Sequence, residues 1–139
     1  MAADLPSKKY LNLAAVKMMV AGAEAEAARR NVSVTICIMD ENAVLLFLER
    51  GDGVSVNTLE WAQKKARHAA LYGTSSKDAA DRVKSGDNAA LAYPNFFPGQ
   101  GGLPIKVDGQ TVGAISASGS KSEIDEAIAQ AGIDALLKK

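Results

Sequence analysis

The sequence predicts an α+β domain in which helices cover the faces of an antiparallel sheet. Short runs of β-branched and apolar residues occur in two pairs, 32–39 with 43–48 and 103–107 with 111–117, and turn residues join each pair. Stretches with helical periodicity come before, between and after the pairs. The predicted order is α-β-β-α-α-β-β-α, a sandwich of helices around a central sheet.

Length and composition narrow the class of protein. The 139 residues predict a single domain over residues 1–139, large enough to bury a core. Sixteen acidic and 16 basic side chains balance, which argues against a nucleic-acid partner. No stretch approaches the ~20 apolar residues of a membrane span, and the N-terminus lacks an apolar signal core. We therefore expect a cytoplasmic protein without a membrane partner.

The first half of the chain predicts a helix and a hairpin. After a polar arm, residues 10–30 have the periodicity of an amphipathic helix rich in alanine. Its small side chains would let another backbone approach closely, which suits packing on a sheet or on a partner subunit. The runs 32–39 and 43–48 are joined by a turn at residues 40–42. Both runs are almost continuously apolar, which favours a sheet covered on both faces. Cys37, the single cysteine, is expected to be a buried and inert thiol.

Residues 56–73 predict the next helix, which Gly73 would end. One stripe of this helix carries mixed chemistry at spacings i, i+4, i+7 and i+11. Its members are Trp61, Lys65, His68 and Tyr72. A helix at 78–84 and a short turn at 88–92 follow, and an aromatic loop at 93–100 then leads to the second hairpin.

Glycines surround the second hairpin. Asp108-Gly109 is a strong two-residue turn signal, and Gly113 within a strand indicates a bulge or a close neighbour. Gly101 and Gly102 precede the hairpin, and they serve either the turn and twist or a rim of exposed backbone N–H groups. The aromatic side chains of loop 93–100 are expected beside this rim. A closing helix begins near Lys121.

Several segments together resemble the GlcG/HbpS-like haem-binding family, which includes the C-terminal domain of PduO-type cobalamin adenosyltransferases. They are residues 49–53, Lys65-Ala66, 101–105, Asp108-Gly109, 113–119 and Asp125-Glu126. The resemblance implies a profilin-like α-β-α sandwich, a homotetramer or homo-octamer, and haem as a possible cofactor. Some haem-binding relatives carry a histidine in the first helix, and this chain has none there.

The first functional hypothesis is an oligomeric protein that binds haem or another small ligand. Its cleft would lie between the Gly101-Gly102 rim, the turn 50–53 and the Lys65/His68 face of the helix. His68, the only histidine, is the candidate axial ligand for haem iron, or else a structural or subunit contact. Tyr93 and Phe96 would line the pocket or pack against a neighbouring subunit.

The alternative hypothesis is a small catabolic enzyme of the isomerase, tautomerase or hydratase type. Arg50 would hold the carboxylate of an oxo-acid, and the rim N–H groups would stabilise an enolate. Asp52, Lys65 or His68 would move the proton. Arg50, Asp52 and Lys65 are alternatively a structural ion-pair network that ties the strand end to the helix. A third hypothesis is an accessory subunit whose glycines serve assembly only.

Overall fold

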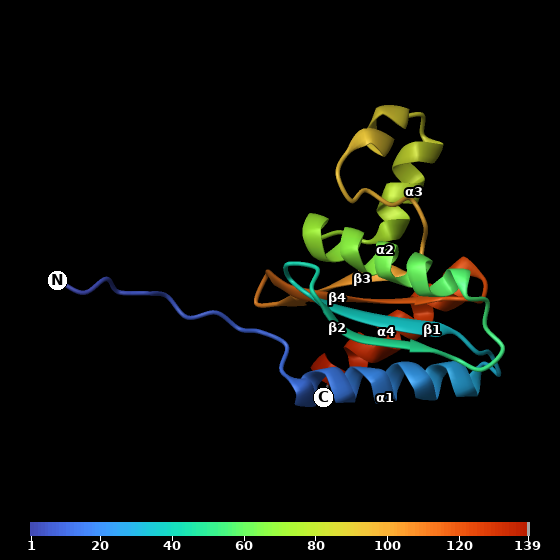
Figure 1. Ribbon diagram of the computed structural model, residues 1–139, viewed down its shortest axis with the longest axis horizontal. Helices are drawn as coiled ribbons and strands as arrows, with labels where there is room; N and C mark the ends of the chain where they lie inside the picture. Colours follow the sequence, from blue (N-terminus) through green and yellow to red (C-terminus); the bar gives the residue numbers. More distant parts are fainter. Residues whose placement is uncertain (139) are drawn as a thin grey trace.

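A four-stranded antiparallel sheet lies between helices in the computed structural model, which describes residues 1–138 (Figure 1). The elements in chain order are α1 (Leu13–Arg29), β1 (Thr35–Asp40), β2 (Leu45–Arg50), α2 (Asn57–Tyr72), α3 (Ser76–Lys84), the 3₁₀ helix η1 (Asn88–Ala92), β3 (Gly102–Val107), β4 (Gln110–Ser118) and α4 (Ser122–Leu137). The strand order is β2-β1-β4-β3. The predicted α+β sandwich and its element order are confirmed.

The two faces of the sheet are covered differently. Helices α1 and α4 pack together below one face, and α2 crosses the other, with α3 projecting away from the sheet (Figure 1). A Cβ placed on Gly22 of α1 would lie 2.5 Å from the Cβ of Ala135 of α4, so these helices approach closely. The alanine-rich face of α1, which was predicted to let another backbone approach, therefore packs on helix α4.

Large side chains fill the core under α1 and α4, where Met19, Ile115 and Ile128 are fully buried. Alanines line the face under α2. Cys37 lies buried in this second core, and burial raises the pKa of its thiol to about 12. The prediction of an inert cysteine agrees with this environment.

Strand β2 departs from the predicted burial. Strand β1 is buried along almost its whole length, as expected for a strand covered on both faces. Strand β2 lies at the edge of the sheet, and Leu45 and Leu46 are 45% and 38% exposed. The expectation that both strands of the first hairpin are covered is therefore wrong for β2, because its apolar run faces outward at the sheet edge.

The turn before β2 also differs from the prediction, which began the strand at Ala43. Ala43 has a φ of 60°, in the left-handed region. The Asp40 carboxylate accepts hydrogen bonds from the N–H groups of Asn42 and Val44, both at 2.9 Å. These bonds close the turn over Ala43, so the strand begins only at Leu45.

Replacing Ala43 with glycine should raise the free energy of unfolding by about 1 kcal/mol, because glycine adopts this φ without a Cβ clash. Urea unfolding measures the change. Ala25→Gly is the matched control, since Ala25 is exposed within helix α1 and its replacement should cost about 1 kcal/mol. A loss of stability in both variants would contradict the strain at Ala43.

Two predictions for the second hairpin are confirmed, the Asp108-Gly109 turn and the special position of Gly113. Asp108 and Gly109 both have positive φ, 52° and 79°, as a type I′ turn requires. A Cβ on Gly113 would lie 2.4 Å from the Met39 carbonyl oxygen, and the register shifts directly opposite, after Ile105. Gly113 thus has both predicted features, a close backbone neighbour and an irregularity in the strand pairing.

Candidate functional site

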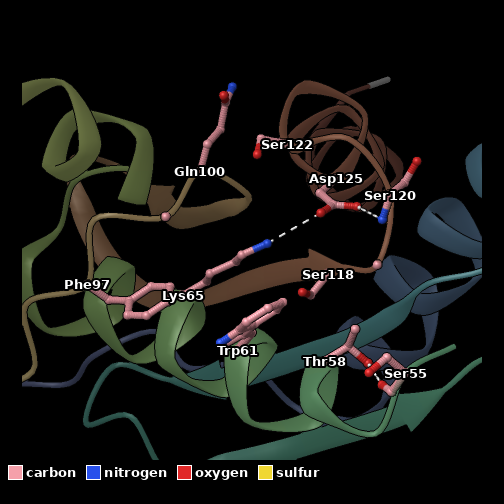
Figure 2. A pocket seen from close by; sticks show the side chains of 12 residues that line it. Ser55, Thr58, Trp61, Lys65, Phe97, Gln100, Ser118, Ser120, Ser122 and Asp125 are labelled. Carbon is pink, nitrogen blue, oxygen red and sulfur yellow. Dashed lines mark hydrogen bonds and ion pairs between the residues drawn. The ribbon is translucent and has the colours of Figure 1, made fainter. Parts of the chain in front are cut away.

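A cavity of about 360 Å³ opens between the first turns of α2 and α4 and the end of the aromatic loop (Figure 2). Its lining combines aromatic rings, one buried ion pair and several hydroxyl groups. The lining residues are Ser55, Thr58, Trp61, Lys65, Phe97, Gly99, Gln100, Ser118, Gly119, Ser120, Ser122 and Asp125. Mixed apolar and polar linings of this kind are typical of small-molecule sites.

The ion pair in this cavity joins α2 to α4. Figure 2 shows the Lys65 side chain extending toward Asp125, with Nζ 3.3 Å from Oδ2. Their side chains are only 8% and 3% exposed. The Lys65 Nζ also donates to the Ala117 carbonyl oxygen at 3.0 Å, and the Ser120 N–H donates to Asp125 Oδ1 at 3.0 Å. Both charges are therefore held in place by neighbours from β4 and the loop after it.

Burial brings the pKa values of Lys65 and Asp125 closer together. Desolvation lowers the pKa of Lys65 and raises the pKa of Asp125, and the attraction between the two charges opposes both shifts. The ionic and neutral forms of the pair therefore lie closer in free energy than those of an exposed pair. Such convergence in a cavity open to solvent marks a candidate proton-transfer site.

Gly101 and Gly102 allow the aromatic loop and β3 to lie directly against Lys65. A Cβ on Gly102 would be 2.4 Å from the Lys65 carbonyl oxygen, and one on Gly101 would be 2.8 Å from Lys65 Nζ. The Gly102 N–H donates to the buried Ser76 hydroxyl at 2.9 Å. The prediction of an exposed N–H rim is thus wrong for Gly102, because that donor is already used inside the fold.

His68 lies one turn further along α2, outside the lining of the Lys65 cavity. It is buried, and its Nδ1 accepts the Phe97 N–H at 3.1 Å. Its ring stacks on Tyr72 at 4.8 Å between centroids and meets the edge of Phe96 at 5.2 Å. Burial lowers the pKa of His68. The imidazole therefore anchors the aromatic loop in its neutral form.

The predicted stripe on α2 accordingly divides between two places. Trp61 and Lys65 line the large cavity, whereas His68 and Tyr72 line a second cavity of about 220 Å³ together with Phe96. Tyr93 belongs to the aromatic group around Phe96, at 6.2 Å between ring centroids, and Arg82 lies over its ring. The aromatic loop thus contributes Phe97 to the Lys65 cavity and Phe96 to the second cavity, while Tyr93 packs against Phe96.

Arg50 and Asp52 lie on the surface at the end of β2. Both are exposed, and the lining of the Lys65 cavity, drawn from residues 1–138, does not include them. The backbone carbonyl of Asp52 accepts the Ser33 hydroxyl at 2.9 Å. The alternative of an ion-pair network between Arg50, Asp52 and Lys65 is wrong, because Lys65 pairs with Asp125 of α4.

Asp125 is the functional residue that sequence reasoning did not place in the site. From the sequence it is named only within the Asp125-Glu126 segment of the family resemblance, without a role. A signal was nevertheless present, since Asp125 shares a helix face with Ile128, Ala129 and Gly132, all buried. A carboxylate in the buried stripe of a helix needs a partner, and Lys65 is that partner.

Residues 1–138 contain neither a cluster of metal-binding side chains nor a helix that could span a membrane. No group of three His, Cys, Asp or Glu side chains lies close enough there to hold a metal ion. Every helix in that part of the chain is too short or too polar to cross a bilayer.

Comparisons with known proteins place the chain among haem-related proteins. A family model described as haem degrading protein HbpS-like matches residues 11–134. Protein GlcG of Escherichia coli K12 is 32% identical over 114 residues, which cover 82% of this chain and 85% of GlcG. An uncharacterised 15.0 kDa protein of Citrobacter freundii is 29% identical, over 89% of this chain and 90% of its own.

Solved structures agree in fold. HbpS superposes with a TM-score of 0.86 at 27% identity, with both chains covered completely. PduOC in complex with haem gives a TM-score of 0.84 at 25% identity, covering 93% of this chain and 96% of PduOC. The ORFY protein of Klebsiella pneumoniae gives 0.87 at 24% identity, over 100% and 99% of the two chains.

Proposed function

This chain belongs to the HbpS-like family of haem degrading proteins, and from that premise we propose that it is a binding protein for a planar organic molecule that carries a carboxylate, with haem as the first candidate. The proposed site is the Lys65 cavity. The observation that carries the proposal is the Lys65 ammonium, buried in a cavity that Trp61 and Phe97 also line. Aromatic rings favour a flat ligand, and an ammonium favours a carboxylate.

The cavity is better suited to bind the propionates and the flat face of a haem than to coordinate its iron. Lys65 and the hydroxyl groups of Ser118 and Ser122 can bind a propionate, and Trp61 can pack against the macrocycle. Iron needs a donor such as His, Cys, Met or Tyr, and the lining contributed by residues 1–138 includes none of these. We therefore expect ligand binding here through the carboxylate and the flat face, without an iron bond from this cavity.

His68 remains the alternative axial ligand predicted from the sequence. Its Nδ1 accepts the Phe97 N–H, so iron would have to bind through Nε2 within the aromatic group of Tyr72 and Phe96. The two assignments predict different behaviour toward a porphyrin without iron. Binding through the cavity needs no iron, whereas binding through His68 depends on it.

Titration with haemin and with iron-free protoporphyrin IX tests the proposal. We expect saturable binding of both with similar affinity, and Trp61→Ala should weaken both about tenfold through lost ring packing. Leu71→Ala is the matched control, because Leu71 is exposed on the same helix outside the cavity lining. Haemin binding that His68→Gln abolishes, with no porphyrin binding, would instead support the axial ligand. Failure of both ligands would reject the haem class.

The Lys65–Asp125 pair favours a second candidate, proton transfer on a small oxo-acid. Two groups with converging pKa values, 3.3 Å apart in a cavity, can give and take a proton. Of the three predicted catalytic residues, Lys65 fits this role best, since Asp52 is exposed on the surface and the His68 ring is packed into the aromatic loop. Asp125 takes the role of its partner.

The predicted homotetramer or homo-octamer remains a proposal. Exposed apolar side chains on the edge strand β2, Leu45 and Leu46, support it, as do Leu13 and Met18 on the outer side of α1. Edge strands with exposed apolar residues favour pairing between chains. An assembly through these surfaces would leave the Lys65 cavity between α2 and α4 intact.

A further inference from the structure

Lys65 differs from the other described lysines in its surroundings. Every other lysine among residues 1–138 is exposed, whereas Lys65 is buried at the wall of a cavity. Its Nζ has two acceptors, the Ala117 carbonyl oxygen at 3.0 Å and Asp125 Oδ2 at 3.3 Å. The stem of the side chain is fixed by Gly101 and Gly102, which lie against it. The nitrogen is therefore held in one position, with a carboxyl group in contact.

We propose that Lys65 Nζ captures the carbonyl carbon of a small oxo-acid or aldehyde as a Schiff base, with Asp125 as the proton donor. The inference rests on the second proposed function, since it states how the cavity would engage an oxo-acid. A buried lysine beside an acid is the arrangement that carbonyl chemistry needs, because the amine must be neutral to attack and the departing oxygen must be protonated.

The neutral form of the pair supplies every atom of this step. The lone pair of the Lys65 amine forms the N–C bond as the carbonyl π bond breaks, and transfer of an amine proton to oxygen gives a carbinolamine. Asp125 then donates its carboxyl proton to the hydroxyl group, which leaves as water while nitrogen forms the C=N bond. Amine, carboxylic acid and ketone thus give an iminium ion, a carboxylate and water. The products are an ion pair at the positions that Lys65 and Asp125 already occupy.

The surroundings of Nζ suit a carbonyl compound that also carries a carboxylate. Ser118, Ser120 and Ser122 line the cavity close to Asp125, and their hydroxyl groups can donate to a carboxylate. Trp61 and Phe97 line the same cavity and give the carbon skeleton of the ligand an apolar surface to pack against. The volume of about 360 Å³ is near the lower end of the range for ligand sites, roughly 300–1,000 Å³, which favours a small acid.

Electrostatics support the same assignment. Burial lowers the pKa of Lys65 and raises the pKa of Asp125, so the neutral pair is more populated than it would be at the surface. Lys64, the preceding residue, is exposed and pairs with Glu60 at 3.4 Å. Lys64 therefore serves as an internal reference for ordinary lysine reactivity on the same helix.

Reductive trapping tests the proposal on the full chain. The folded protein is incubated with pyruvate or benzaldehyde and sodium cyanoborohydride, and peptide mapping by mass spectrometry measures the label at each lysine. We expect Lys65 to be labelled roughly tenfold faster than Lys64. Asp125→Asn, which can still accept the Ser120 N–H, should slow labelling of Lys65 and leave Lys64 unchanged. Lys64→Arg is the matched control and should leave the Lys65 label intact.

Two outcomes would overturn the inference. Labels spread over the exposed lysines, with Lys65 unlabelled in the folded protein, would reject the Schiff base. Labelling of Lys65 that Asp125→Asn leaves unchanged would reject the proton donor. Deuterium exchange at the methyl group of pyruvate in D₂O tests the proton-transfer function separately. Exchange without trapping keeps that function and rejects the Schiff base, whereas trapping without exchange supports the Schiff base and rejects the function.

Discussion

Replacing Lys65 with methionine should lower the free energy of unfolding by about 3–5 kcal/mol, because Asp125 is then left buried without its partner. Methionine has nearly the length of lysine and keeps the packing of its stem, so the loss reports the missing charge. Equilibrium urea unfolding, followed by circular dichroism, measures it. The Ser120 N–H still donates to Asp125 Oδ1, but it does not replace the positive charge of the lysine.

Removing both charges is the informative comparison. The double variant Lys65→Met/Asp125→Asn should recover more than half of the loss, since neither a buried charge nor an unpaired carboxylate remains. A double variant as unstable as Lys65→Met alone would mean that the lysine contributes through packing. Glu60→Gln with Lys64→Met removes the exposed neighbouring pair, and it should change stability by no more than about 1 kcal/mol.

The stability of the wild type should also depend on pH in a way that the double variant does not share. The raised pKa of Asp125 means that the folded state holds its proton more tightly than the unfolded chain does. Relative stability therefore falls as pH rises from 3.8 through the folded pKa of Asp125. The lowered pKa of Lys65 has the opposite consequence, so stability is regained as pH rises from its folded value toward 10.5.

Gly102→Ala should be the second severe substitution, with a loss of about 3 kcal/mol at the upper end of overpacking costs. Its Cβ would lie 2.4 Å from the Lys65 carbonyl oxygen and 2.7 Å from the carbonyl carbon, and backbone atoms of a helix cannot move aside alone. Strand β3 and helix α2 would have to separate. Thermal or urea unfolding measures the change.

Gly109→Ala is the control that separates crowding from backbone strain. A Cβ at Gly109 meets no atom within 4 Å, but the residue has a φ of 79°. We expect a loss of only about 1–2 kcal/mol there, from the left-handed conformation alone. Equal losses at the two positions would contradict close packing as the reason for Gly102.

Local chemistry predicted the elements well, because turns and caps are short-range features. Asp108-Gly109 and Gly73 carry their backbone conformation in their own residue types, and the structure has them at positive φ. The burial of strand β2 was harder to predict, because an apolar run does not show whether the strand lies at the centre or the edge of a sheet. That distinction depends on strand order, and order is a property of the whole chain.

The candidate site was predicted only in part. Lys65 was identified from its stripe on α2, but its partner lies 60 residues away on α4, and no local pattern joins the two. His68 was predicted as a ligand because it is the only histidine in the sequence. The fold uses its Nδ1 to hold the Phe97 backbone, and iron binding through Nε2 stays a prediction. A residue type that occurs once in a sequence can bind a ligand or can form a hydrogen bond within the fold, and its rarity does not show which.

The packing of α1 on α4 joins two segments that lie far apart in the sequence, and this has a consequence for the order of folding. Contacts between distant segments form only after the intervening chain has been brought together, so the apolar face of α1 stays uncovered until α4 docks on it. The same docking brings Asp125 to Lys65. Closure of the core and completion of the cavity are therefore one folding event.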